Sequence, residues 1–131
     1  MLSIVKSIAL HGLQGYLVNI QVDISAGMPS FEIVGLPDTS IRESKERVKT
    51  AIKNSTSEFL SRKIVVNLAP ASTKKEGSIF DLPIAVGILM ANGFIYNADL
   101  TDTILIGELS LDGSICPIKG ILPICIEAKH L

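Results

Sequence analysis

The stretch Val66 to Ile88, VNLAPASTKKEGSIFDLPIAVGI, decides the fold of this 131-residue chain. It begins inside the apolar run Ile64–Leu68, which has the length and composition of a buried strand. A charged loop with Gly77 follows, and Asp81 then stands at the position of a helix N-cap, with Pro83 in the first turn. A strand, a glycine loop and a helix in this order predict an α/β fold. The start of such a helix has free N–H groups that attract anions, and phosphate-binding sites and serine nucleophiles are often found there.

No nucleotide or hydrolase signature fills that position. The chain lacks the P-loop pattern G-x-x-x-x-G-K-[ST], the nucleophile pattern G-x-S-x-G and a GxGxxG after a strand. Ser78 lies in the loop, and it is expected to be a solvated hydroxyl or an alternative cap, because a serine nucleophile needs a base within reach. Cys116 and Cys125 lack the spacing of a zinc site. We therefore expect no catalytic residues, cofactor or metal in this chain.

Length and composition predict a single domain, residues 1–131. The charges of the 12 basic and 13 acidic residues nearly cancel, so the domain as a whole lacks the net positive charge that favours nucleic-acid binding. The hydrophobic share of 47% is high, which suggests surface buried against another domain or subunit. The longest apolar stretch, which begins at Leu82, is interrupted by Pro83 and Gly87 and falls short of the ~20 residues of a spanning helix. Without a signal peptide either, we expect a cytoplasmic protein and no membrane partner.

Hydrophobic periodicity and turn residues predict the remaining elements. The first three strands are predicted to form an antiparallel meander, and a capping box from Ser40 to Glu43 to open a helix that runs to about Ser55. The last residues carry no helix stop signal, so the chain is expected to be a segment of a longer protein. The predicted strands are Leu2–Leu10, Val18–Ile24, Ser30–Gly35, Lys63–Leu68, Thr103–Glu108 and Ile115–Ile118, and further helices cover Asp81–Ala91 and begin at Ile121. They predict an α/β (α+β) two-layer sandwich, a mixed sheet with helices on one face.

Three long motifs carry a resemblance to a known family. They are MPSFEIVGLPDTSIRESKERVKTAI at Met28–Ile52, the block VNLAPA…KKEG…FDLPIAVGIL, and IGELSLDGSICPIKG at Ile106–Gly120. From Val5 to His130 the chain resembles the N-terminal domain of the Mg-chelatase-like AAA+ ATPases, the branch with the competence protein ComM and the YifB proteins. The resemblance implies a fold like the Lon protease domain and the second domain of ribosomal protein S5, with a left-handed crossover.

The resemblance to Lon also bears on catalysis. A Lon-type protease would carry its serine at the position of Ile79 and its lysine at the position of Leu122, and both are apolar here. A dyad of Ser78 and Lys119 would need the two side chains within about 3 Å of each other. The resemblance therefore implies a protease scaffold without its chemistry.

A basic stretch is the candidate nucleic-acid contact. Lys45, Lys49 and Lys53 recur at i, i+4 and i+8, so they share one helix face, away from the inward Val48–Ala51–Ile52 stripe. A solvated helix surface is the commoner explanation of such a pattern. Nine of the twelve basic residues lie between Arg42 and Lys75, and the candidate contacts are Lys45, Lys49, Lys53, Arg62, Lys63, Lys74 and Lys75.

The resemblance implies the role of the full-length protein. Relatives continue into a AAA+ module that binds ATP and Mg²⁺ and forms homo-oligomeric rings, and ComM-type members act on DNA during recombination. This chain would be a non-catalytic accessory domain that contacts the motor, a neighbouring subunit or DNA. A Lon-like Ser–Lys peptidase and an RNA- or ribosome-binding module are the alternatives, and the net charge of −1 disfavours the latter.

Overall fold

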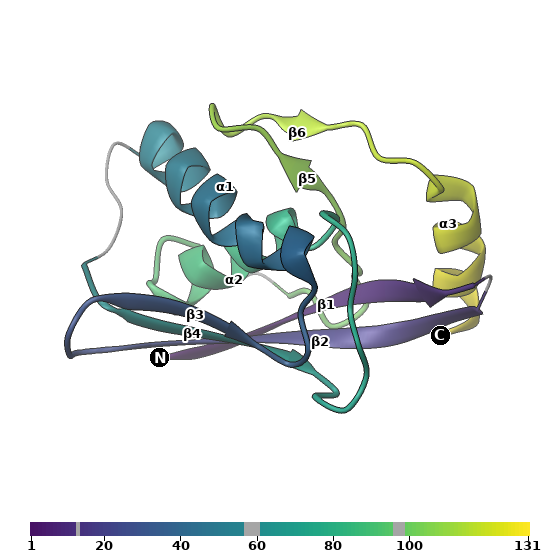
Figure 1. Ribbon diagram of the computed structural model, residues 1–131, viewed down its shortest axis with the longest axis horizontal. Helices are drawn as coiled ribbons and strands as arrows, with labels where there is room; N and C mark the ends of the chain where they lie inside the picture. The colour runs from purple at the N-terminus through teal and green to yellow at the C-terminus, as the bar shows by residue number, and fades with distance from the viewer. Residues whose placement is uncertain (13, 57–60, 96–98) are drawn as a thin grey trace.

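A four-stranded mixed sheet forms the base of the molecule in the computed structural model, which describes residues 1–12, 14–56, 61–95 and 99–131 (Figure 1). The order of the strands in the sheet is β1-β2-β4-β3. β2 is antiparallel to both β1 and β4, whereas β3 and β4 are parallel. The strands are β1 (Leu2–His11), β2 (Gln14–Ser25), β3 (Ser30–Val34) and β4 (Lys63–Ala69).

The predicted antiparallel meander of the first three strands is wrong, because β4 lies between β2 and β3. β3 still runs antiparallel to β2, but its hydrogen bonds go to β4. β4 pairs on both sides, and its Ile64, Val66 and Leu68 face the core and are fully buried. The five-residue β3 suits an edge, where short strands limit unwanted pairing.

Two helices cover one face of the sheet, which gives the predicted two-layer α/β sandwich (Figure 1). α1 (Thr39–Thr56) connects the parallel strands β3 and β4, and α2 (Asp81–Ala91) packs against β1, β2 and α1. α2 is apolar on nearly every side because it is enclosed between the sheet and α1. The hydrophobic core lies between these layers and includes Val18, Ile20, Val22, Ile64, Val66, Leu68, Ile41, Val48, Phe80, Ile84 and Ile88.

The C-terminal third is less regular than the sequence pattern predicted. A strand was predicted over Thr103–Glu108, but only β5 (Glu108–Leu109) forms, paired with β6 (Ile115–Cys116). Within residues 103–107, the Leu105 N–H donates to the Lys6 carbonyl at 3.0 Å and the Gly107 N–H to the Ile79 carbonyl at 2.8 Å, which are single contacts and not a strand ladder. α3 (Ile121–His130) lies beside the end of the β1–β2 hairpin, apart from α1 and α2 (Figure 1). Within the described ranges, no helix is long and apolar enough to span a membrane.

Candidate functional site

The first turn of α2, a predicted location for anion binding, has no free N–H group. The Asp81 N–H donates to the Ser78 carbonyl at 3.3 Å, and the Leu82 N–H donates to the Gly107 carbonyl at 3.0 Å. Pro83 has no N–H, and the Ile84 N–H already bonds to the Phe80 carbonyl. The helix start therefore lacks the donors with which such termini bind phosphate.

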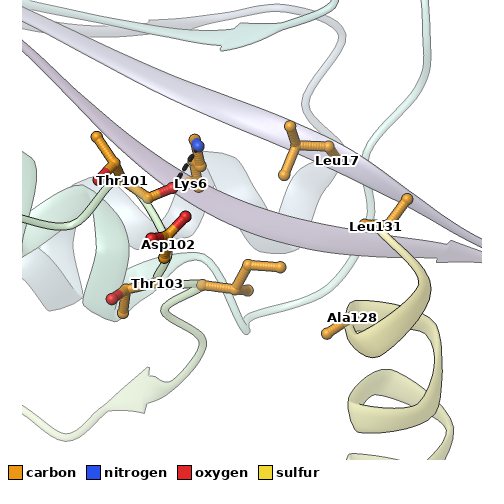
Figure 2. A pocket seen from close by; sticks show the side chains of 8 residues that line it. Lys6, Leu17, Thr101, Asp102, Thr103, Ala128 and Leu131 are labelled. Atoms are coloured by element: carbon orange, nitrogen blue, oxygen red, sulfur yellow. Dashed lines mark hydrogen bonds between the residues drawn. The ribbon is translucent and has the colours of Figure 1, made fainter.

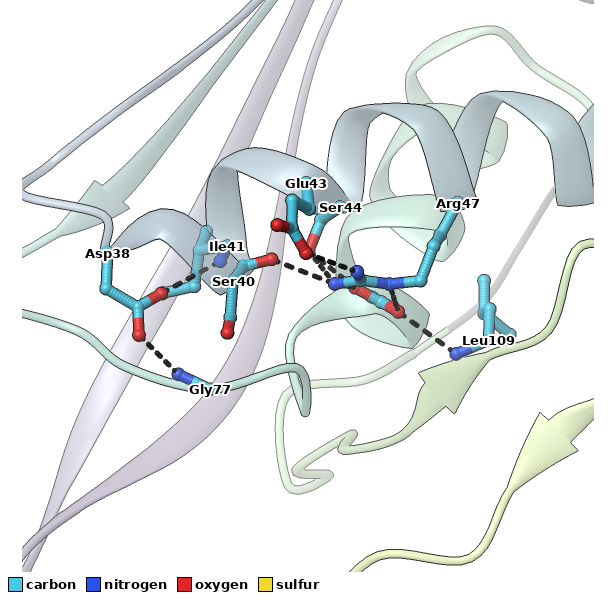
Figure 3. Close-up of polar contacts among 9 residues, drawn as sticks. Asp38, Ser40, Ile41, Glu43, Ser44, Arg47, Gly77 and Leu109 are labelled. Atoms are coloured by element: carbon cyan, nitrogen blue, oxygen red, sulfur yellow. Dashed lines mark hydrogen bonds and ion pairs between the residues drawn. The ribbon is translucent and has the colours of Figure 1, made fainter.

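Asp81 is not the predicted helix cap. The N-cap position of α2 is Phe80, without a side-chain cap, and the Asp81 side chain is fully buried. Its carboxylate accepts hydrogen bonds from the Ser44 hydroxyl at 2.5 Å and the Leu109 N–H at 3.1 Å. It also accepts hydrogen bonds from the Arg47 guanidinium, whose dashed lines are drawn in Figure 3. A buried carboxylate requires such partners, because an isolated charge is costly to remove from water.

Arg47 binds both oxygens of Asp81. Its Nε lies 2.6 Å from Oδ2 and its Nη2 lies 3.1 Å from Oδ1, a two-pronged geometry that strengthens ion pairs. The hydrogen bond to Asp81 raises the pKa of Arg47, although partial burial opposes the rise. Glu43 lies farther away, at 3.7 Å, and is largely exposed. We call Ser44, Arg47, Asp81 and the Leu109 N–H the α1–α2 latch, because it joins α1, α2 and β5.

The loop before α2 is tied to the loop after β3. Lys75 is completely buried, and its ammonium group donates to the carbonyls of Gly35, at 2.9 Å, and Pro70. Burial lowers the pKa of Lys75. The prediction that Lys75 contacts nucleic acid is therefore wrong, because its charge is used inside the fold.

Gly77 belongs to the same junction between loops. Its N–H donates to Asp38 Oδ2 at 3.0 Å, while Asp38 Oδ1 accepts the Ile41 N–H at 2.8 Å (Figure 3). Asp38 therefore caps α1 and holds the Gly77 loop against its start. The predicted capping box is wrong, because α1 begins at Thr39 and Ser40 lies inside its first turn.

A cavity of about 190 Å³ brings Ile79 and Lys119 together. Ser78 is not among its lining residues in the part of the chain that the structure describes. Leu122 is 68% exposed. Tyr16 and Lys74 also line this cavity, and the Tyr16 hydroxyl donates to the Lys74 carbonyl at 2.9 Å. Burial, together with the charge of Glu76, raises the pKa of Tyr16. Lys119 and the aliphatic Ile79 thus line this cavity without Ser78, so the cavity does not supply a serine nucleophile beside a lysine base.

A second cavity, of about 230 Å³, lies between the hairpin, residues 101–104 and the end of α3 (Figure 2). The Lys6 ammonium at its wall donates to the Thr101 carbonyl at 2.5 Å. Ala128 and Leu131 of the α3 end contribute its apolar side. Lys6 therefore connects β1 to the loop at residues 101–104.

The other basic residues of the predicted contact remain at the surface. Lys49 and Lys53 are exposed on α1 and Lys45 is half-buried, while Val48 and Ala51 of the opposite face are in the core. Arg62, Lys63 and Lys74 are also exposed. This leaves six of the seven predicted cations accessible to a ligand.

Sequence reasoning missed Ser44, Arg47 and Asp38. Ser44 carried a signal, because it falls three residues after Ile41 and four before Val48, within the inward stripe of α1. A polar residue at such a position needs a buried partner. Nothing in the sequence indicated that this partner is Asp81, thirty-seven residues away.

Comparison with known proteins places these features in a family. Residues 20–131 match the family described as subunit ChlI of Mg-chelatase. The chain is 41% identical over 128 residues to the competence protein ComM of Haemophilus influenzae and 40% identical over 127 residues to the uncharacterized protein YifB of Escherichia coli. It is 39% identical over 124 residues to an uncharacterized protein of Mycobacterium tuberculosis.

These matches cover 95–98% of this chain but 25% of each relative. The chain therefore spans about a quarter of the length of the curated relatives it matches. The family match and the identity over nearly all of the chain agree with the three sequence motifs. The chain belongs to the family of the Mg-chelatase subunit ChlI.

Proposed function

We propose that this chain is a non-catalytic accessory domain of a longer, ATP-hydrolysing AAA+ protein of the ComM and YifB type. That protein would bind ATP and Mg²⁺ outside this domain, form a ring and act on DNA in recombination or natural transformation. The name of the Haemophilus relative, a competence protein, supports the link to DNA uptake. Its whole-protein role comes to this chain through sequence similarity alone.

The hydrogen bonding at the α2 N-terminus is the observation that supports a non-catalytic role. Its backbone donors, the buried Asp81 and the buried Lys75 are all bonded within the domain. These groups, which the sequence offered for phosphate binding, are therefore used within the fold. A Ser–Lys peptidase has less support, because Lys119 shares its cavity with Ile79.

We expect residues 1–131 alone to show no binding of ATP and Mg²⁺ in calorimetry. The chain has no P-loop lysine or hydroxyl to hold the β- and γ-phosphates and the metal. The full-length protein, titrated in the same buffer, is the positive control. Micromolar affinity of residues 1–131 would contradict the assignment of ATP binding to another part of the protein.

DNA contact, if this domain contributes to it, is expected to run through the solvent-accessible lysines of α1. Changing Lys45, Lys49 and Lys53 to Glu in the full-length protein should weaken DNA binding at low salt. It should also reduce the slope of log affinity against log salt by up to about three, one for each lost phosphate contact. The measurement is a binding titration at two salt concentrations.

The matched control changes the same three residues to Arg, which keeps the charge and should keep both affinity and slope. If the Glu variant binds DNA like the parent at both salt concentrations, the α1 cations are an ordinary solvated face. The domain would then act through protein contacts alone.

A further inference from the structure

α3 presents an apolar stripe to solvent. Ile121, Leu122, Cys125 and Ile126 follow one another at i, i+1, i+4 and i+5, which puts them on one face of the helix. Ile121 is 48% exposed, Leu122 68% and Ile126 49%, and Cys125 is also exposed. We call these four residues the α3 stripe.

The opposite face of α3 makes the contacts with the domain. Ile124 is its one buried residue, and Glu127 accepts a hydrogen bond from the Gly15 N–H at 3.0 Å. Ala128 and Leu131 lie on the side of the cavity beside β1 and β2 (Figure 2). α3 is thus packed on one side by few residues, while its larger aliphatic side chains point away from the core.

Such a stripe differs from single exposed apolar residues. Met28 and Leu111 are exposed too, but each lies in a turn, and single exposed apolar residues are usual for protein surfaces. A contiguous aliphatic face on a helix generally marks a contact surface. Lys129, in the last turn of the helix, is exposed and forms no salt bridge among the described residues.

We propose that the α3 stripe is the docking surface for another part of the same polypeptide, one that presents an aliphatic face edged by carboxylates. This inference rests on the proposed accessory role. The relatives are about four times as long as this chain, so family members contain ample further sequence to cover the stripe. The aliphatic side chains define the apolar centre of the partner surface, and Lys129 defines an acidic contact at its edge.

Cys125 supplies a direct test, because it lies inside the α3 stripe. In the native full-length protein, we expect its alkylation by iodoacetamide to be at least roughly tenfold slower than in the guanidinium-unfolded protein, since thiol reactivity follows exposure. Mass spectrometry of the Cys125 peptide gives the rate. A cysteine placed at Met28, which is 86% exposed, is the control and should react at nearly the same rate in both states.

The dependence on concentration identifies the occupant. Protection that persists on dilution supports an intramolecular partner, whereas protection that disappears on dilution means a second copy and overturns the proposal. Free reaction of Cys125 in the native protein also overturns it, without any variant of the stripe. ATP hydrolysis by the same preparation distinguishes failure of the docking proposal from failure of the proposed accessory role. An active ATPase in which Cys125 reacts freely would contradict the docking surface but not the accessory role.

Leu122→Asp tests the mechanism of protection. It should raise the native alkylation rate of Cys125 at least severalfold, because a carboxylate would be buried against an apolar, acid-edged surface. Met28→Asp is the matched control and should leave the rate unchanged. A Leu122→Asp protein that melts normally and keeps Cys125 fully protected would contradict the proposed contact.

Discussion

Replacing Asp81 by alanine is expected to lower the free energy of unfolding by about 3 kcal/mol, because it leaves the Arg47 guanidinium and the Leu109 N–H without their shared partner. Asp81 itself is fully buried, but the Arg47 side chain is 21% exposed. Water will therefore compensate part of the loss, which keeps the estimate at the lower end for a broken buried pair. Denaturant unfolding of both proteins measures the difference.

The asparagine variant separates the latch from a helix cap. At an N-cap, asparagine would replace aspartate at little cost, and alanine would cost about 1 kcal/mol. In the α1–α2 latch, asparagine loses the charge that Arg47 binds through two nitrogen atoms, so Asp81→Asn should cost nearly as much as Asp81→Ala.

Glu43→Ala is the matched control for charge near Arg47. Glu43 is 65% exposed and lies 3.7 Å from the guanidinium, so its removal should cost less than about 1 kcal/mol. An Asp81→Asn protein as stable as the parent would show that the latch contributes little, and the ion pair would then be incidental to the fold.

The sequence predicted local elements well and their partners poorly. The bounds of α2 matched because Pro83 and the apolar run from Leu82 are local signals. The place of β4 between β2 and β3 was missed, because alternation along a strand says which face is buried and not which neighbour it pairs with. The same limit applies to residues 103–107, where the N–H groups of Leu105 and Gly107 donate to the distant carbonyls of Lys6 and Ile79.

The roles of charged residues were the hardest to predict. Lys74 and Lys75 are adjacent in the sequence, yet one is exposed and the other is completely buried. Composition gave both the same expectation of a solvated or phosphate-binding lysine. The distinction comes from backbone carbonyls of Gly35 and Pro70, which the fold brings to Lys75 from two loops. Tertiary contacts of this kind produce no periodic pattern in a single sequence, so they cannot be predicted from it.

Gly35→Ala is expected to be among the most destabilising single-methyl additions in the chain, at roughly 3 to 5 kcal/mol. Gly35 has a φ of 103°, which alanine rarely adopts, and an added Cβ would lie 2.4 Å from the Leu68 carbonyl oxygen and 2.8 Å from its nitrogen. Leu68 is buried in β4, so its backbone cannot move aside cheaply. Urea unfolding measures the loss.

Gly77→Ala is the matched control, since Gly77 has a similar φ of 91° but nothing within 4 Å of the added methyl group. It should cost only the conformational strain, about 1 to 2 kcal/mol. The difference between the two variants therefore reports the close approach of β3 to β4. Equal losses would mean that the backbone at Gly35 relaxes freely. The junction of loops that Lys75 makes through the Gly35 carbonyl would then be more adaptable than its burial implies.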